Sequence, residues 1–205
     1  MRNFSALVLG VGLALPVQAD TSVRQLVSKE NRALGTIPSG QLDALLKRPN
    51  SAGSITYSGR WVASQPKASG GAQWNCLAEA LYFEARGETI KGQFAVAEVI
   101  LNRVDSRLFP NSICGVVKQG TGRKYACQFT YTCDGHKEVI AEPAAFARVG
   151  KIAKAMLGGA PRPLTRGATY YHTKAVRPSW SRKFTRTTTI GVHHFYRRPT
   201  RLSQN

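Results

Sequence analysis

The sequence feature that most constrains the fold is a pair of consecutive helix patterns, CLAEALYFEARGETIKGQFAVAEVILNRV, in residues 76–104. The first pattern predicts a helix over residues 75–86 that ends at Gly87, because glycine is common where helices stop. The second predicts a helix over residues 91–105 with apolar residues on several sides. A helix that is apolar around most of its circumference has to be buried. The chain is therefore expected to build a domain around this second helix.

The elements that follow change from helix to strand along the chain. Residues 112–120 have the pattern of a short helix, and residues 142–157 predict a longer amphipathic helix. Beyond them, GATYYHT and KFTRTTTIGVHHFYRR are rich in β-branched and aromatic residues, with Gly191 where a hairpin would turn. Helices first and a small antiparallel β element near the C-terminus predict an α+β fold.

The N-terminal residues 1–19 have the pattern of a secretory signal. Arg2 precedes an apolar run over residues 4–15, and small residues lead to an expected cleavage after Ala19. The less favoured alternative is an uncleaved membrane anchor, since the apolar run is shorter than the roughly 20 residues that span a bilayer. We therefore expect the protein to be periplasmic or secreted.

Composition divides the remaining chain into three parts. Residues 20–71 are expected to form a low-complexity linker with a short helix, best placed in VRQLVSKENRAL, because residues 47–71 are rich in Ser, Gly, Pro and Lys. Residues 72–200 contain the helix and strand patterns and form the expected folded domain, and residues 201–205 are a short tail.

The chain is strongly basic, with 29 Lys and Arg against 11 Asp and Glu and a formal net charge of +18. Such a balance predicts an anionic partner. Because export makes nucleic acid an unsuitable natural partner, we expect electrostatic contact with anionic envelope polymers or a membrane surface.

The four cysteines, Cys76, Cys114, Cys127 and Cys133, favour disulfides in an exported chain. Four cysteines allow three pairings, and Cys127–Cys133 is the expected pair because the two residues are close in sequence. The alternative is a zinc site built with histidines from the set His136, His172, His193 and His194. The sequence has no paired CxxC motifs and no HExxH motif. No metal is therefore expected.

One carboxylate interrupts an apolar helix stripe. Glu84 takes the i+7 position of a stripe whose earlier members are Leu77, Ala80 and Leu81. Apolar surroundings disfavour the charged form of a carboxyl and raise its pKa. A glutamic acid that stays protonated near neutral pH can act as a general acid in glycoside cleavage. The alternative is a core glutamate paired with an arginine such as Arg86 or Arg103.

The other carboxylates have a weaker claim to chemistry. Glu88 follows Gly87 and is expected to be solvated at a helix end. Glu98, Asn102 and Asp105 form a polar stripe on the second helix, which predicts a solvated or hydrogen-bonded face. Asp134, in TCDGH, is the remaining candidate for a second catalytic carboxylate.

Several blocks, EALYFEARGE, GQFAVAEVILNRV, FPNSICGVV, CQFTYTCDG, ATYYHT and HHFYR, occur in the order seen in the SleB/CwlJ-type cell-wall hydrolases, the spore cortex-lytic enzyme family. The chain resembles this family over residues 76–197 and not over residues 20–70. The resemblance implies a peptidoglycan hydrolase with a helical core like that of lysozyme and the lytic transglycosylases. It also implies that the first glutamate of EARGE, Glu84, is the catalytic acid.

The matched blocks also suggest residues that bind substrate: Gln128, Phe129, Thr130, Tyr131, Tyr171 and His172. The loop residues would offer hydrogen bonds and an aromatic platform, while Tyr171 and His172 would orient Glu84 or contact the glycan. The alternatives are that Phe129 belongs to the core and that His172 is a satisfied polar residue at a strand end.

The expected function is cleavage of the glycan strand between N-acetylmuramic acid and N-acetylglucosamine, with no cofactor. Because only Glu84 has a clear claim, the resemblance favours a lytic-transglycosylase mechanism with an anhydro product. The alternatives are a zinc N-acetylmuramoyl-L-alanine amidase and an envelope protein that binds peptidoglycan without cutting it.

Overall fold

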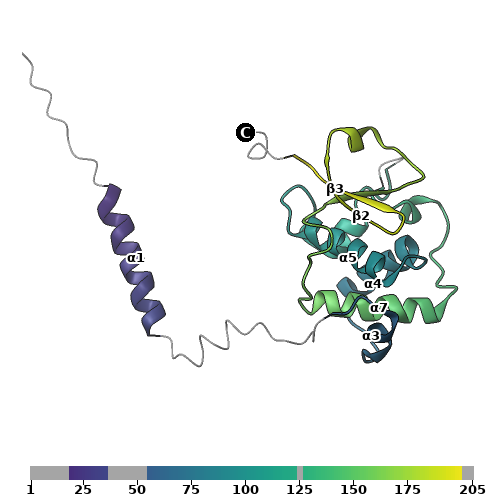
Figure 1. Ribbon diagram of the computed structural model, residues 1–205, viewed down its shortest axis with the longest axis horizontal. Coiled ribbons are helices and arrows are strands. Elements are labelled where there is room, and N and C mark those ends of the chain that lie inside the picture. Colours follow the sequence, from purple (N-terminus) through teal and green to yellow (C-terminus); the bar gives the residue numbers. More distant parts are fainter. Residues whose placement is uncertain (1–18, 37–54, 124–126, 200–205) are drawn as a thin grey trace, which may run out of the picture. The chain divides into compact units, whose positions relative to one another are not determined.

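The computed structural model describes residues 19–36, 55–123 and 127–199, in two separate units (Figure 1). The first unit contributes α1 (Ala19–Gly35), which contains the helix expected in VRQLVSKENRAL. None of the helices in the described ranges combines the length and apolarity that a bilayer crossing requires. The expected signal segment before Ala19 and the tail at 201–205 lie outside the described residues.

The second unit is built mainly from α4 (Ala72–Ala85), α5 (Ile90–Val104) and α7 (Pro143–Leu157). Short helices α3 (Gly59–Ser64) and α6 (Ile113–Val117) complete the helical part. As predicted, α5 is central, and every residue from Gly92 to Ile100 is buried. The predicted α+β fold is confirmed, with a helical core and a small sheet near the C-terminus.

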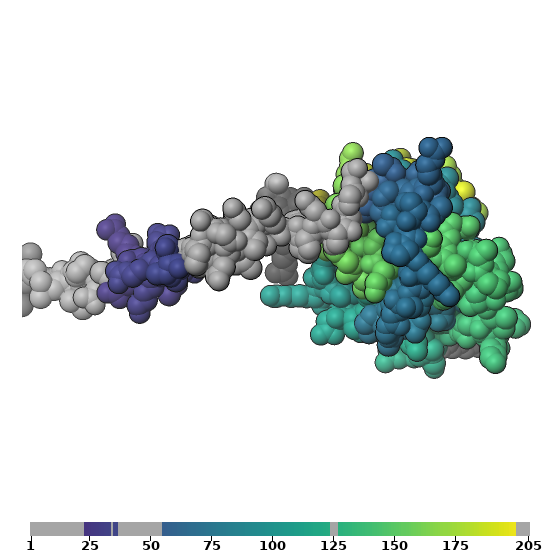
Figure 2. Space-filling model, turned by 90° about the horizontal axis from the view of Figure 1, so that it is seen from below, coloured from purple at the N-terminus to yellow at the C-terminus, as the bar shows by residue number. Residues whose placement is uncertain are grey.

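The linker expected over residues 20–71 does not extend over residues 55–71, which pack on the domain. Val62 in α3 is 2% exposed, and the rings of Tyr57 and Trp61 meet Phe94 edge-on at 5.2 and 5.8 Å. Lys151 of α7 donates to a carbonyl of α3, and Figure 2 shows the blue segment beside the green surface of α7. A few apolar residues within a polar stretch are enough to anchor it, although the average composition is that of a linker.

The turn between α4 and α5 is braced by a buried glutamine. Nε2 of Gln93 donates to the carbonyl oxygens of Arg86 and Glu88 at 3.3 and 3.0 Å. Thr89 caps α5 by accepting a hydrogen bond from the backbone of Gly92 at 3.2 Å. These bonds hold the end of α4, where Glu84 lies, in a defined position against α5.

The sheet contains β1 (Tyr170–Thr173), β2 (Thr185–Ile190) and β3 (His193–Arg197) in the antiparallel order β1-β3-β2. The predicted hairpin turns at Gly191, whose φ of 58° lies in the left-handed region that favours glycine. Phe195 and Ile190 pack on Ala95 and Val99 of α5. The sheet therefore covers one side of the central helix.

The polar stripe of α5 attaches the loop before the sheet to the helix. The buried Glu98 carboxylate accepts hydrogen bonds from the backbone of Leu164 at 3.0 Å, and from the backbone and hydroxyl of Thr165 at 2.8 and 2.9 Å. Asn102 donates to the carbonyl of Ala168 at 3.0 Å. The hydrogen-bonded interpretation of this stripe is therefore confirmed, and Glu98 has a structural role.

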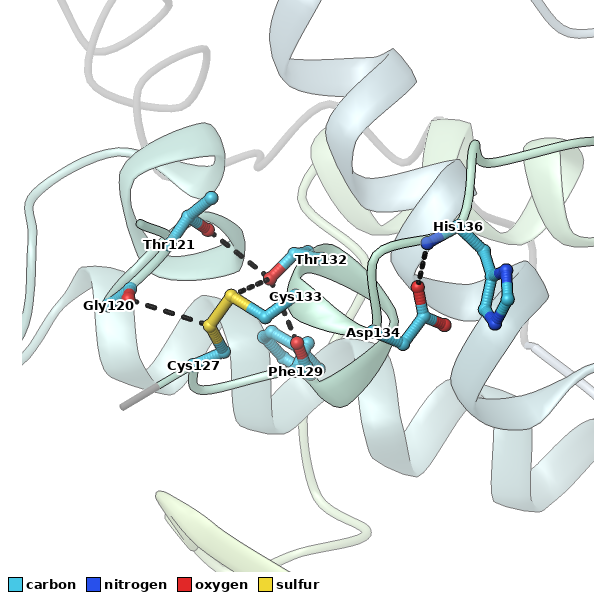
Figure 3. The surroundings of a disulfide bond; sticks show 8 residues. All are labelled: Gly120, Thr121, Cys127, Phe129, Thr132, Cys133, Asp134 and His136. Carbon is cyan, nitrogen blue, oxygen red and sulfur yellow. Dashed lines mark hydrogen bonds between the residues drawn. A yellow bond between two sulfur atoms is a disulfide. The ribbon is translucent and has the colours of Figure 1, made fainter. Parts of the chain in front are cut away.

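Both predicted disulfides are present. Cys76–Cys114 joins α4 to α6, and Cys127–Cys133 closes the loop that leads into the 3-10 helix η1 (Thr130–Cys133). In Figure 3, the Thr132 hydroxyl also donates to the carbonyl of Phe129, at 2.9 Å. The expected pairing of Cys127 with Cys133 is confirmed, and this loop is held in a compact form.

Candidate active site

Glu84 lies in the last turn of α4, where the helix meets the sheet. The stripe that leads to it is fully buried in Leu77, Ala80 and Leu81, while Glu84 itself is partly exposed. The hydroxyl of Tyr171, on β1, donates a hydrogen bond to Oε2 of Glu84 at 3.1 Å. Tyr171, expected to orient Glu84 or to contact the glycan, therefore lies within hydrogen-bond distance of this carboxyl.

The surroundings of Glu84 favour its protonated form. Burial raises the pKa of this carboxyl, while the hydrogen bond from Tyr171 and the charge of Arg103 act in the opposite direction and only partly offset it. Burial and the charge of Glu84 also raise the pKa of the Tyr171 hydroxyl, which therefore remains a donor. The pair is thus a carboxyl with a raised pKa that is held in place by a phenol.

The alternative that Glu84 is a core residue in an arginine ion pair is not what the structure shows. Arg86 binds Glu142 instead, with Nε 2.8 Å from Oε1. Nε of Arg103 donates to the carbonyl of Thr169 at 2.7 Å. Arg103 influences Glu84 through its charge, because no ion pair joins them among the described contacts.

Arg103 is a buried cation that sequence reasoning considered only as an ion-pair partner. It is 1% exposed, and its Cζ lies 5.4, 5.6 and 6.0 Å from the ring centroids of Phe109, Phe129 and Tyr170. With the amide of Gln128 turned so that its oxygen faces the guanidinium, that oxygen accepts from both terminal nitrogens at 3.2 Å. Arg103 therefore positions the loop that carries Gln128.

The loop residues expected to bind substrate have different environments. Gln128 is partly exposed beside Arg103, and Thr130 is exposed at the start of η1. Phe129 is 2% exposed, which corrects its expected role as a platform and favours the core alternative. Its ring is buried because Arg103 and Tyr131 pack against it.

Tyr131 lies on the side of the loop that approaches the end of α4. Its ring stacks on Phe83 at 4.5 Å between centroids, and its buried hydroxyl has no hydrogen-bond partner within the described parts of the chain. Burial raises the pKa of this hydroxyl, and the charges of Glu79 and Glu84 raise it further. This buried hydroxyl therefore stays protonated and has no acceptor among the described residues.

His172 does not join Glu84, contrary to the expectation that it would orient this residue. Successive residues of a strand point to opposite faces, so His172 faces away from the side on which Tyr171 reaches Glu84. Its ring nitrogens lie 2.8 Å from the carbonyl of Thr173 and 3.0 Å from the hydroxyl of Tyr196. The alternative of a satisfied polar residue is the one that the structure supports.

Glu88 is not the solvated residue that the sequence suggested. Its side chain is 9% exposed and that of His193 is 4% exposed, with Oε1 and Nδ1 3.3 Å apart, although they are not aligned as a hydrogen bond. Burial lowers the pKa of His193, and the charge of Glu88 opposes this shift. His193 also meets Tyr171 edge-on, with 5.1 Å between the ring centroids. The Glu88–His193 pair therefore lies next to the tyrosine that binds Glu84.

The remaining candidates for a second carboxylate are engaged elsewhere. Asp134 is exposed, and its Oδ1 accepts from the backbone of His136 at 2.9 Å, as Figure 3 shows. Asp105 forms an ion pair with Arg162. All four cysteines are in disulfides and so cannot act as thiolate ligands, and no three metal-binding side chains gather within the described ranges.

Fold and site together define a domain that presents a partly exposed carboxyl with a raised pKa at the end of α4. Residues 87–196 match the family described as Cell Wall Hydrolase, and the chain belongs to this family. The match begins just after Glu84, which itself lies outside the matched residues.

Parts of the chain are also similar to spore cortex-lytic enzymes. The chain is 46% identical over 72 residues to a spore cortex-lytic enzyme of Bacillus subtilis, covering 35% of this chain and 21% of the relative. It is 38% identical over 122 residues to one of Halalkalibacterium halodurans, covering 58% of this chain and 33% of the relative. The chain thus spans about a fifth to a third of the length of these curated relatives.

A solved structure agrees with this assignment. The catalytic domain of the germination-specific lytic transglycosylase SleB from Bacillus anthracis has a TM-score of 0.51 and 32% identity, and the similarity covers 64% of this chain and 99% of that domain. The resemblance to the SleB/CwlJ-type family is therefore confirmed.

Proposed function

We propose that the protein is a peptidoglycan hydrolase that cuts the glycan strand between N-acetylmuramic acid and N-acetylglucosamine, with Glu84 as general acid and base. The observation that carries the proposal is the Glu84 carboxyl, whose pKa is raised by burial and which Tyr171 holds in place. Family membership and the lytic transglycosylase described for the solved relative support the same substrate class.

The mechanism that fits one carboxyl is lytic transglycosylation. Glu84 donates its proton to the glycosidic oxygen as the bond from the muramoyl C1 to that oxygen breaks. The resulting carboxylate then takes the proton of the C6 hydroxyl of the same sugar, whose oxygen bonds to C1. The product is a 1,6-anhydromuramoyl end, formed without water. A hydrolytic glycosidase instead uses two carboxylates, about 5–5.5 or about 6.5–9.5 Å apart. Glu98 and Asp105 are bonded to other residues, Glu88 lies against His193, and Asp134 is exposed and accepts a backbone hydrogen bond from His136.

The neighbours of Glu84 receive supporting roles in this proposal. Gln128 and Thr130, on the loop held by Arg103, would donate or accept hydrogen bonds with the glycan. Tyr131, whose hydroxyl is buried, would shape the wall of the substrate site through its ring, which stacks on Phe83. We also propose that residues 1–19 direct export, since a substrate in the wall requires an extracytoplasmic location.

Digestion of purified peptidoglycan in heavy-oxygen water tests the reaction. The full chain is expected to release unlabelled fragments that are one water lighter than hydrolysed fragments, and Glu84→Gln should release none while remaining folded by circular dichroism. Label at a new reducing end would contradict transglycosylation and indicate a second carboxylate. Released peptides would favour the amidase, and binding without any released fragment would favour the non-catalytic alternative.

A further inference from the structure

Two adjoining hollows lie on the face of the sheet opposite to that of Tyr171. Their volumes are about 280 and 480 Å³, and they share Arg177, Ser181, Arg186 and Tyr196. One wall comes from the segment that joins β1 to β2, which includes the 3-10 helix η2 (Ser179–Arg182), and the other comes from β2 and β3. We call both together the outer hollow. In Figure 1 the sheet lies at the end of the domain away from α7.

The outer hollow gathers positive charge. Its cationic lining residues are Lys174, Arg177, Arg182 and Arg186. The last Asp or Glu in the sequence is Glu142, so the segments that build the hollow contain no acidic residue. None of these cations forms an ion pair with another of the described residues. An unneutralised cluster of this kind in a concave site is expected to attract an anion.

His194, at the hollow, lies in the same field. His194 and His172 both line the smaller part. Desolvation, the charge of Arg186, and then His172 and Lys174 all lower the pKa of His194. The positive potential therefore already affects a titratable group of the protein.

The lining also indicates the kind of anion. Guanidinium groups bind the paired oxygens of carboxylate or phosphate, and the rings of Tyr196 and Phe184 add an apolar wall. A concave site suits a group that protrudes from a larger molecule. Binding to a flat membrane usually relies on inserted apolar side chains, whereas Val176 is the one strongly exposed large apolar residue among these lining residues. A protruding anionic group is therefore favoured over a bilayer.

Peptidoglycan carries such groups, because the short peptides on its glycan strands have free carboxylates. We propose that the outer hollow binds a carboxylate of these peptides and so holds the wall polymer at a second place, away from Glu84. This inference rests on the proposed function, which supplies peptidoglycan as the substrate. Alternate residues of β1 would then serve two sites, since Tyr171 contacts Glu84 while His172 lines the hollow.

The test measures binding and not cleavage. The full chain carrying Glu84→Gln is sedimented with purified peptidoglycan sacculi, and with the same sacculi after their carboxyls have been converted to methylamides. Adding Arg177→Ala and Arg186→Ala should weaken binding to intact sacculi by about tenfold or more, because each lost charge-assisted contact is sizeable. The matched control, Arg60→Ala with Arg107→Ala, removes the same charge from exposed positions outside the hollow and should change binding less than about twofold.

The other arms separate the alternatives. Sacculi with methylamide groups should bind the Glu84→Gln chain weakly. This binding should be as weak as that of intact sacculi to the chain that also carries Arg177→Ala and Arg186→Ala. Equal weakening by the hollow pair and the control pair would overturn the proposal, because net charge alone would then explain binding. An effect of the hollow pair that appears only with phosphatidylglycerol vesicles would assign the hollow to a lipid phosphate instead. Failure of the proposed function is recognised separately, because the unmutated chain would then release no fragments from sacculi.

Discussion

The pKa of Glu84 is raised because burial outweighs the two groups that favour its charged form. Tyr171 is one of them, since its hydroxyl bonds the carboxylate. Tyr171→Phe should therefore raise the pKa of Glu84 further, and the alkaline limb of the pH profile of kcat/KM should move to higher pH. Tyr170→Phe is the control, since its hydroxyl has no hydrogen bond to a described residue. A lower kcat/KM without a shift of the alkaline limb would show that Tyr171 supports the structure and does not affect the pKa of Glu84.

The same residue links stability to pH. The folded-state pKa of Glu84 is raised above its ordinary value of 4.5, so ionisation favours the unfolded chain. Stability relative to Glu84→Gln should be highest below pH 4.5, fall as pH rises through the raised pKa, and level off above it. Urea unfolding of both proteins at several pH values measures this difference. A difference that does not change with pH would contradict the environment assigned to Glu84.

Sequence reasoning could find Glu84 because helix periodicity is a local property. A glutamate within an otherwise apolar helix stripe can be recognised from the sequence of that one helix. It could not assign the roles of Arg103 or Glu88, because their partners lie on distant elements. Glu88 meets His193 across the fold, and Gln128 reaches Arg103 through a loop. Tyr171 and His172 also looked equivalent in sequence, and only the pairing of β1 with β3 decides which one faces the helices.

At the scale of elements, α3 shows where composition misleads. Val62→Ala should lower the free energy of unfolding by about 2 kcal/mol, because it removes buried apolar surface and leaves a cavity. Val139→Ala, at a position that is 61% exposed, should cost less than about 0.5 kcal/mol. Urea denaturation followed by circular dichroism gives both values. Equal effects would mean that residues 55–71 do behave as a linker.

The β2–β3 hairpin depends on a glycine for two reasons. A Cβ at Gly191 would lie 2.0 Å from Oε2 of Glu88, and φ is 58°. Gly167 has a φ of 75° but open space around it, so Gly167→Ala isolates the backbone cost. Gly191→Ala should destabilise the fold by at least about 1 kcal/mol more than Gly167→Ala. Adding Glu88→Ala should recover part of this loss, and no recovery would contradict the contact with Glu88.

At the scale of the whole molecule, the two disulfides should contribute unequally. Their cysteines are separated by 38 and 6 residues, and a longer closed loop restricts the unfolded chain more. Replacing Cys76 and Cys114 by serine should cost about 1.6 kcal/mol more than replacing Cys127 and Cys133, from the logarithmic dependence on loop length. Urea unfolding of the two double variants checks this order, and the reverse order would show that loop entropy does not dominate.

The distribution of charge along the chain separates binding to the wall from cleavage of the glycan. Residues after Glu142 include no acid, so their positive charge does not depend on a carboxylate. Glu84 can act as an acid only while it holds its proton, and burial raises the pKa at which that proton is lost. Above that pKa, the protein would remain attached to the wall while its catalytic acid is silent. An alkaline pH would then stop wall cleavage reversibly without releasing the enzyme from the wall. A return to lower pH would restart cleavage at the same place.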